Sequence, residues 1–232
     1  SISFIKQAIF TKSKWLGEYP YDVVSVVEDE KAGGGGMEYP TITYLSSGES
    51  EKDLDFVINH EVGHNWFYGI LASHERTHPW MDEGMNSFME ALYVMYKYPP
   101  EQYGNLNEMN SLGIASAMLG TNQFNFKETG HFEYQLATST FTDQAIENKA
   151  VDFTYINYGI VAYKKTAIAF NYLQNYLGDS IFFAGMQNYF QKWKFKHPYP
   201  SDVQKSFEKA SGKDLSWFFV DLKKKKKSQD FK

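Results

Sequence analysis

Residues 60–64, His-Glu-Val-Gly-His, and residues 80–84, Trp-Met-Asp-Glu-Gly, decide how this sequence is interpreted. Two residues four apart in an α-helix lie on one face, so the imidazoles of His60 and His64 can reach a single metal ion. Eighteen residues separate His64 from Glu83, which offers a third, anionic ligand. Two nitrogens and one oxygen leave the fourth position of a tetrahedral zinc ion open, as is typical of catalytic sites. The sequence therefore predicts a hydrolytic site with one zinc ion per chain.

Glutamates next to the predicted ligands have candidate roles in the same site. Glu61 follows the first ligand directly, where a carboxylate can deprotonate an attacking water as a general base. Glu90 lies two helical turns after the third ligand and is a candidate to orient a ligand histidine, the alternative being a solvated helix glutamate. Residues 74–78, His-Glu-Arg-Thr-His, also satisfy the two-histidine pattern. We predict that they form a loop without metal, because the chain must reverse there and no third acidic ligand follows at the matching distance.

Two further stretches resemble a known family. Together with the residues above, the chain resembles the zinc aminopeptidases of the aminopeptidase N and leukotriene hydrolase type, which are gluzincins. Residues 35–40, Gly-Gly-Met-Glu-Tyr-Pro, resemble the exopeptidase motif of that family. Residues 158–165, Tyr-Gly-Ile-Val-Ala-Tyr-Lys-Lys, resemble the segment that carries its catalytic tyrosine. Three motifs in family order, spanning most of the chain, make this resemblance far more specific than the zinc motif alone.

The resemblance assigns substrate-binding roles to the first of these stretches. It implies that Glu38 meets the free α-ammonium of a peptide and that Gly35, Gly36 and Met37 contact the bound substrate. Glycines allow the main chain to approach a ligand closely, and an edge strand can pair with an extended peptide. Without the resemblance, the glycine run at 33–36 would be interpreted as a surface linker.

The second stretch carries the expected oxyanion donor. The resemblance implies that the phenol of Tyr163 stabilises the tetrahedral oxyanion, with Tyr158 as the alternative for the same role. Two positions depart from the family pattern, because Tyr39 stands where the family has asparagine and Thr166 where it has glycine.

The predicted function is a zinc-dependent aminopeptidase that hydrolyses the N-terminal bond of peptides with a free N-terminus. The substitution at Tyr39 keeps open a gluzincin endopeptidase, which would share the zinc site but lack amine anchoring. The third hypothesis is a catalytically incomplete fragment that acts only as a peptide-binding module. Relatives are expected to be longer, so flanking domains of a longer parent chain are expected to be missing from this excised catalytic domain.

Composition indicates the size of the domain and argues against nucleic-acid binding, a membrane span and cysteine chemistry. The chain has 232 residues, of which 43% are hydrophobic and 18% aromatic, enough for one domain with a sizeable core. A net charge of −5 gives no footprint for nucleic acid. No segment approaches the roughly 20 apolar residues of a membrane span. The sequence contains no cysteine, which excludes disulfides and thiolate zinc sites.

Periodicity and the resemblance together predict an α+β fold, a single thermolysin-like catalytic domain over residues 1–232. A small mixed sheet lobe (1–50) precedes a mostly helical part (51–222), with the zinc helix at their junction and a basic, lysine-rich tail at 223–232. A buried strand is predicted at 21–27 and an edge strand at 37–45, and an insertion at about 103–148. The predicted helices are 3–16, 51–71, 82–97, 106–118, 155–177, 179–194, 201–210 and 214–222.

Overall fold

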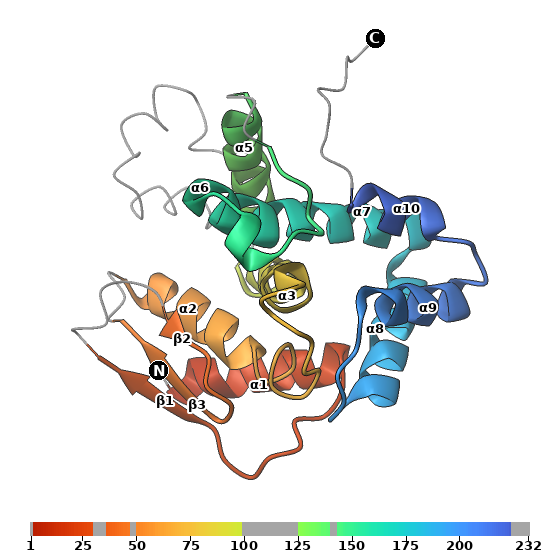
Figure 1. Cartoon of the computed structure of the whole chain (residues 1–232). Helices are drawn as coiled ribbons and strands as arrows, with labels where there is room; N and C mark the ends of the chain where they lie inside the picture. The colour runs from red at the N-terminus through yellow and green to blue at the C-terminus, as the bar shows by residue number, and fades with distance from the viewer. Residues whose placement is uncertain (1, 30–35, 47–49, 99–124, 140–142, 224–232) are drawn as a thin grey trace.

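The structure, a computed structural model, describes residues 2–29, 36–46, 50–98, 125–139 and 143–223. A small three-stranded sheet lies beside the first two helices, and the rest of the described chain is mostly helical (Figure 1). The sheet is mixed, with the strand order β1-β3-β2. The predicted fold class, a small mixed sheet followed by a helical part, is therefore confirmed.

The edge strand of the sheet is not the one that the sequence predicts. β1 (Ser25–Glu28) pairs in parallel with β3 (Ile42–Leu45), and β2 (Gly36–Met37) pairs antiparallel with the other side of β3. The prediction of one edge strand over 37–45 is wrong, because this stretch forms two elements: β3 is the central strand, and only the end of the short β2 lies at an edge. The chain turns between them at Pro40 and at Thr41, whose φ is 65°. The predicted strand at 21–27 begins only at Ser25 and is half-buried.

The helices follow the predicted spacing with local changes. The helical elements are α1 (Ile2–Trp15), α2 (Glu51–Gly63), the π-helix η1 (Trp80–Gly84), α3 (Met85–Lys97), α5 (Phe126–Thr138), the 3₁₀ turn η4 (Ala150–Asp152), α6 (Tyr155–Asn157), the π-helix η5 (Tyr158–Lys165), α7 (Thr166–Leu177), α8 (Asp179–Trp193), α9 (Pro200–Ser211) and α10 (Ser216–Asp221). The predicted helix 155–177 is thus divided among α6, η5 and α7. α5 was not predicted and lies within the expected insertion. The predicted helix 106–118 and all of the lysine-rich tail except its first residue, 223, lie outside the described residues.

Helix α2, which carries the predicted ligand His60, begins as predicted but ends earlier. Ser50 caps its N-terminus, since its Oγ accepts the Asp53 N–H at 3.2 Å. The predicted end at 71 is wrong, because the helix stops at Gly63. The residues after Gly63 instead contact segments near the sheet. Asn65 Oδ1 accepts the Thr41 N–H at 2.8 Å, and Trp66 Nε1 donates to the Gly17 backbone oxygen at 2.8 Å. The apolar residues beyond Gly63 therefore belong to a buried turn and do not continue the helix.

Packing places α2 between the two parts of the molecule. α2 contacts β2, β3 and α1 on one side and α3 on the other, and α3 in turn contacts α5, η5 and α7. Figure 1 shows α3 at the centre, with the sheet, α1 and α2 on one side and α5, α6 and α7 on the other. One large apolar cluster joins α1, α2, α3 and α7, and it includes Trp66, Trp80, Phe88 and Phe170. Within the described residues, each helix is too short or too polar to cross a membrane.

Candidate metal centre and active site

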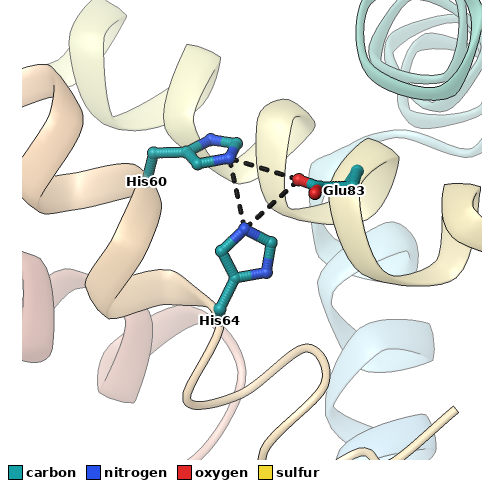
Figure 2. A group of neighbouring side chains, drawn as sticks. All are labelled: His60, His64 and Glu83. Atoms are coloured by element: carbon teal, nitrogen blue, oxygen red, sulfur yellow. Dashed lines mark hydrogen bonds and ion pairs between the residues drawn. The ribbon is translucent and has the colours of Figure 1, made fainter. Parts of the chain in front are cut away.

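Three predicted ligand atoms converge between α2 and η1. His60 lies in the last turn of α2, His64 is the residue directly after its end, and Glu83 faces both from η1 (Figure 2). The two Nε2 atoms lie 3.2 Å apart, and Glu83 Oε2 lies 3.3 Å from His60 Nε2 and 3.2 Å from His64 Nε2. The structure thus brings together the three residues that spacing alone predicted to form one site.

The donor set fits a tetrahedral metal ion. The second nitrogen of each ring contacts a carboxylate, since His60 Nδ1 lies 3.2 Å from Glu90 Oε2 and His64 Nδ1 lies 2.5 Å from Asp82 Oδ1. With a proton on each Nδ1, both Nε2 lone pairs point at each other and at a carboxylate oxygen, an arrangement that repels unless a cation lies between them. Zinc bonds of 2.0–2.1 Å in a tetrahedron place ligand atoms about 3.3 Å apart, in agreement with the observed separations.

The electrostatics of the histidines also favour a cation. Burial lowers the pKa of His60, but its hydrogen bonds to Glu83 and Glu90 outweigh burial and raise that pKa to about 10. Burial likewise lowers the pKa of His64, but the neighbouring Asp82 and Glu83 carboxylates outweigh burial and raise that pKa well above its usual value. Burial raises the pKa of Glu83, yet its hydrogen bonds to both histidines lower it overall. Without a metal the site attracts protons, so protons and a metal ion compete for the same lone pairs.

The carboxylates behind the histidines were only partly foreseen. Glu90 makes the contact with His60 that a role in orienting this ring requires. Asp82, which is 1% exposed, makes the corresponding contact with His64 and was missed. Its position directly before Glu83 was the available signal, but neighbouring residues on a regular helix point in different directions. Only the packing of η1 against α2 shows that both carboxylates reach the same histidine.

Glu61, the candidate base, lies against the first residue of β2. It is 7% exposed, and its Oε2 is buried with no hydrogen-bond partner among the described residues. Burial, as the largest cause, raises the pKa of Glu61 to about 7, a value suited to accepting and returning a proton near neutrality. A Cβ on Gly36 would lie 2.3 Å from the Glu61 carboxyl, so only glycine permits this approach of strand and base.

The exopeptidase-like stretch reaches the metal centre through Glu38. Carboxylate oxygens of Glu38 and Asp82 and a ring nitrogen of His64 lie within 4.8 Å of one another. Glu38 directly follows β2, the exposed edge strand to which Gly36 and Met37 belong. Gly35 lies outside the described residues. A half-buried negative charge therefore stands beside the metal ligands at the edge of the sheet.

Two tyrosines of η5 approach the site from the helical side. The Tyr163 ring stacks on His60, with centroids 5.8 Å apart and planes 15° apart. Burial and the Glu83 carboxylate both raise the pKa of Tyr163, which keeps the phenol protonated. Tyr158 lies edge-on to Tyr163 at 5.9 Å, and burial is the largest cause that raises its pKa to about 12. Tyr163 is therefore the nearer of the two candidates to the metal ligands.

The second two-histidine pattern forms no metal site in the described chain. His74 Nδ1 contacts Thr77, and His78 Nδ1 contacts Glu147 at 2.5 Å. They flank the turn at residues 75–77, so the stretch is the loop that the sequence predicts. Glu147 also accepts the indole N–H of Trp80. The stretch thus holds the start of η1 in place.

A cavity adjoins the metal centre on the side of α5. Its volume is about 420 Å³, and α3, α5, η5 and α7 form its walls. Glu90 and Tyr163 separate it from the metal ligands, and apolar rings such as Phe88 and Phe126 line its interior. A second, more open hollow lies on the other side of η5, beside Tyr158 and the exposed Tyr155.

Comparison with known proteins agrees with this geometry. The probable aminopeptidase 1 of Sulfurisphaera tokodaii is 25% identical over 219 residues, which are 86% of this chain and 25% of that protein. Aminopeptidase N of Lactococcus lactis is 27% identical over 184 residues, 78% of this chain and 19% of its own length. The chain thus spans about a quarter or less of these relatives.

Solved structures share the fold. An M1 zinc metallopeptidase variant of Deinococcus radiodurans, solved with a Tyr-Ser-Ala substrate, has a TM-score of 0.70 at 14% identity, covering 95% of this chain and 44% of that one. Aminopeptidase A of Legionella pneumophila has a TM-score of 0.68 at 17% identity, covering 96% of this chain and 24% of that one. The chain also matches the peptidase family M1 domain over residues 4–222, nearly its whole length. It therefore belongs to peptidase family M1.

Proposed function

We propose that this chain is the catalytic part of a zinc aminopeptidase that removes the first residue of peptides with a free N-terminus. The observation that carries the proposal is the convergence of three ligand atoms, the buried Glu61 carboxylate and the Glu38 carboxylate on one site. His60, His64 and Glu83 would hold the ion. When bound, zinc supplies Lewis acidity toward the scissile carbonyl and lowers the pKa of water to about 7.

Glu61 serves as the general base and then the general acid. Its carboxylate takes a proton from the attacking water and returns it to the leaving amine. Gly36 and the buried surroundings hold this carboxylate in place, and its unpartnered Oε2 remains available for the water. A raised pKa makes the protonated form accessible at neutral pH, which the return of the proton requires.

Tyr163 stabilises the negative charge that develops on the carbonyl oxygen. Its phenol remains protonated because burial and the nearby Glu83 carboxylate raise its pKa, and its ring lies against His60, a predicted metal ligand. A donor aimed at a developing oxyanion in a buried site contributes roughly 2.7–4 kcal/mol in comparable enzymes. Stacking on His60 fixes the direction of the ring.

Glu38 distinguishes an aminopeptidase from an endopeptidase. A substrate that lies along β2 would present its α-ammonium to the Glu38 carboxylate, which lies close to His64 and Asp82. The ammonium would pair with Glu38, while the scissile bond lies at the metal ligands. A charge-assisted contact of this kind is worth roughly 1.5–3 kcal/mol.

The deciding experiment compares free and N-acetylated forms of the same peptides. The 232-residue chain, loaded with zinc, is expected to cleave the free peptides at their first bond and to leave the acetylated forms nearly intact. Glu38→Ala should reduce this preference by about 10- to 100-fold, mainly by slowing the free peptides. Mass spectrometry of the products identifies the bond that is cut.

Each other outcome contradicts the proposal in a defined way. Equal cleavage of both forms at internal bonds would identify an endopeptidase. Binding of peptides without any cleavage, at full zinc occupancy, would identify a peptide-binding module.

A further inference from the structure

A lysine withdrawn from solvent lies directly behind the metal-binding turn. Lys12, from the second half of α1, is 0% exposed. Its ammonium donates to the backbone oxygen and to Oδ1 of Asn59, each at 2.7 Å. Asn59 is the residue immediately before the ligand His60. Lysine is almost never fully buried without a paired charge, so its retention here calls for a specific reason.

A second side chain holds the next carbonyl of the same turn. Asn86, from the first turn of α3, is fully buried, and its Nδ2 donates to the backbone oxygen of His60 at 2.7 Å. Two consecutive peptide groups of α2 thus receive donors from two different helices. The backbone that carries His60, Glu61 and His64 is fixed between α1 and α3.

Gly63 provides the space for both contacts. A Cβ at this position would lie 2.4 Å from Lys12 Cε and 2.0 Å from Asn86 Oδ1. Any side chain here would push at least one of the two away from α2. The glycine inside the two-histidine motif therefore serves the packing behind the metal site.

The charge of Lys12 lies near the carboxylates that surround the ligands. Burial lowers the pKa of Lys12 to about 7, and the carboxylates of Glu90 and Asp55 oppose that shift. Glu90 is the partner of His60 Nδ1. The ammonium therefore stands behind the ligand whose orientation depends on this acid.

We propose that Lys12 is a positioning residue for the metal centre, which acts with Asn86 to fix the α2 turn at residues 59–63. This turn sets the 3.2 Å separation of the two histidine Nε2 atoms and the direction of Glu61. The inference rests on the proposed function only for the identity of the metal.

A matched control separates positioning from general stability. Lys97, from α3, also bridges to α2, with its Nζ 2.6 Å from Oδ2 of the fully buried Asp55. That contact lies more than one helical turn before His60. A lysine that matters only for stability should resemble Lys97 when it is replaced.

The experiment measures metal binding in Lys12→Met and Lys97→Met of the whole chain. Methionine retains the apolar stem and removes the ammonium. Zinc affinity is determined by competition with a chromogenic chelator, the cobalt-substituted proteins are compared by their visible spectra, and Tm is recorded without metal. We expect Lys12→Met to weaken zinc binding by about 10- to 100-fold and to shift the cobalt bands. Lys97→Met should lower Tm while its zinc affinity and cobalt spectrum stay at the wild-type values.

Two results would overturn the inference. One is wild-type zinc affinity and an unchanged cobalt spectrum in Lys12→Met. The other is an equal loss of zinc affinity in both lysine variants in proportion to Tm. If Lys12→Met fails to fold, Asn86→Leu serves as the second variant, because it removes the hydrogen bond from Asn86 Nδ2 to the His60 backbone oxygen. The inference fails if Asn86→Leu then binds zinc with wild-type affinity. A wild-type chain that binds zinc but cleaves no peptide contradicts the proposed function alone.

Discussion

The helix α2 and the π-helix η5 both contribute residues to the candidate site, but they do so by different means. α2 is a regular helix in which residues four apart present both histidines on one face. η5 places Tyr158 and Tyr163, which are five residues apart, about one turn apart because π-helical bonds run from i to i+5. The first arrangement follows from local sequence spacing, and the second depends on the packing of a segment with unusual geometry.

Contact between the two π-helices explains where this geometry occurs. A Cβ on Gly84 of η1 would lie 2.3 Å from Thr166 Cγ2 and 2.5 Å from the oxygen of Ala162. Thr166 Oγ1 donates to the Val161 oxygen at 3.1 Å, five residues earlier, and thus satisfies a carbonyl of η5. Thr166, a departure from the family pattern, fits here because Gly84 leaves room for it. π-Helical turns are frequent at functional sites, and both of these carry candidate site residues.

The largest effect should follow from removing a ligand of α2. His64→Ala is expected to abolish stoichiometric zinc binding, because one imidazole and one carboxylate remain. His78→Ala, which alters a half-buried histidine that pairs with Glu147, should bind zinc as the wild type does. Elemental analysis of the purified proteins measures both. Full zinc occupancy in His64→Ala would show that His64 is not a zinc ligand.

A smaller but still large effect is expected when the base alone is changed. Glu61→Gln preserves shape but cannot accept a proton, so turnover should fall by roughly 10²- to 10⁴-fold while zinc content stays at one per chain. Peptide hydrolysis and metal analysis of the same preparation provide the two readings. Retained activity would show that the base lies elsewhere.

The contribution of η5 should be intermediate and should discriminate between its two tyrosines. Tyr163→Phe removes the hydroxyl that is proposed to stabilise the oxyanion and is expected to lower turnover by roughly 10²- to 10³-fold with unchanged zinc content. Tyr158→Phe is the matched control and should have a much smaller effect. The reverse ranking of the two variants in steady-state kinetics would assign the oxyanion role to Tyr158.

The smallest predicted effect tests how the sheet edge supports α2. Gly36→Ala places a methyl group against the Glu61 carboxyl and should lower turnover by up to about 10²-fold without loss of zinc, because it displaces the base. Gly159→Ala is the control, since a Cβ there meets nothing within 4 Å. Equal turnover in the two variants and the wild type would show that β2 does not position Glu61.

Much of the architecture could be predicted from sequence, and the errors share a cause. The apolar pattern that predicted helix to residue 71 came from Trp66, Ile70 and Leu71, which are buried in a turn. The pattern that predicted an edge strand at 37–45 ignored pairing on the second side of β3. In both cases periodicity recorded which residues are buried, whereas the partner against which they are buried decided the backbone conformation.

The sequence by itself predicted the fold class and the three residues that converge at the candidate metal centre, because helical spacing places His60 and His64 on one face and a short motif indicates Glu83. It also indicated Glu61 through its position next to His60, and Glu38 and Tyr163 through resemblance. Only the tertiary structure revealed Asp82 behind His64 and the donors from Lys12 and Asn86 behind the metal-binding turn. These contacts join residues from helices far apart in the chain, and local spacing carries no information about which helices pack together.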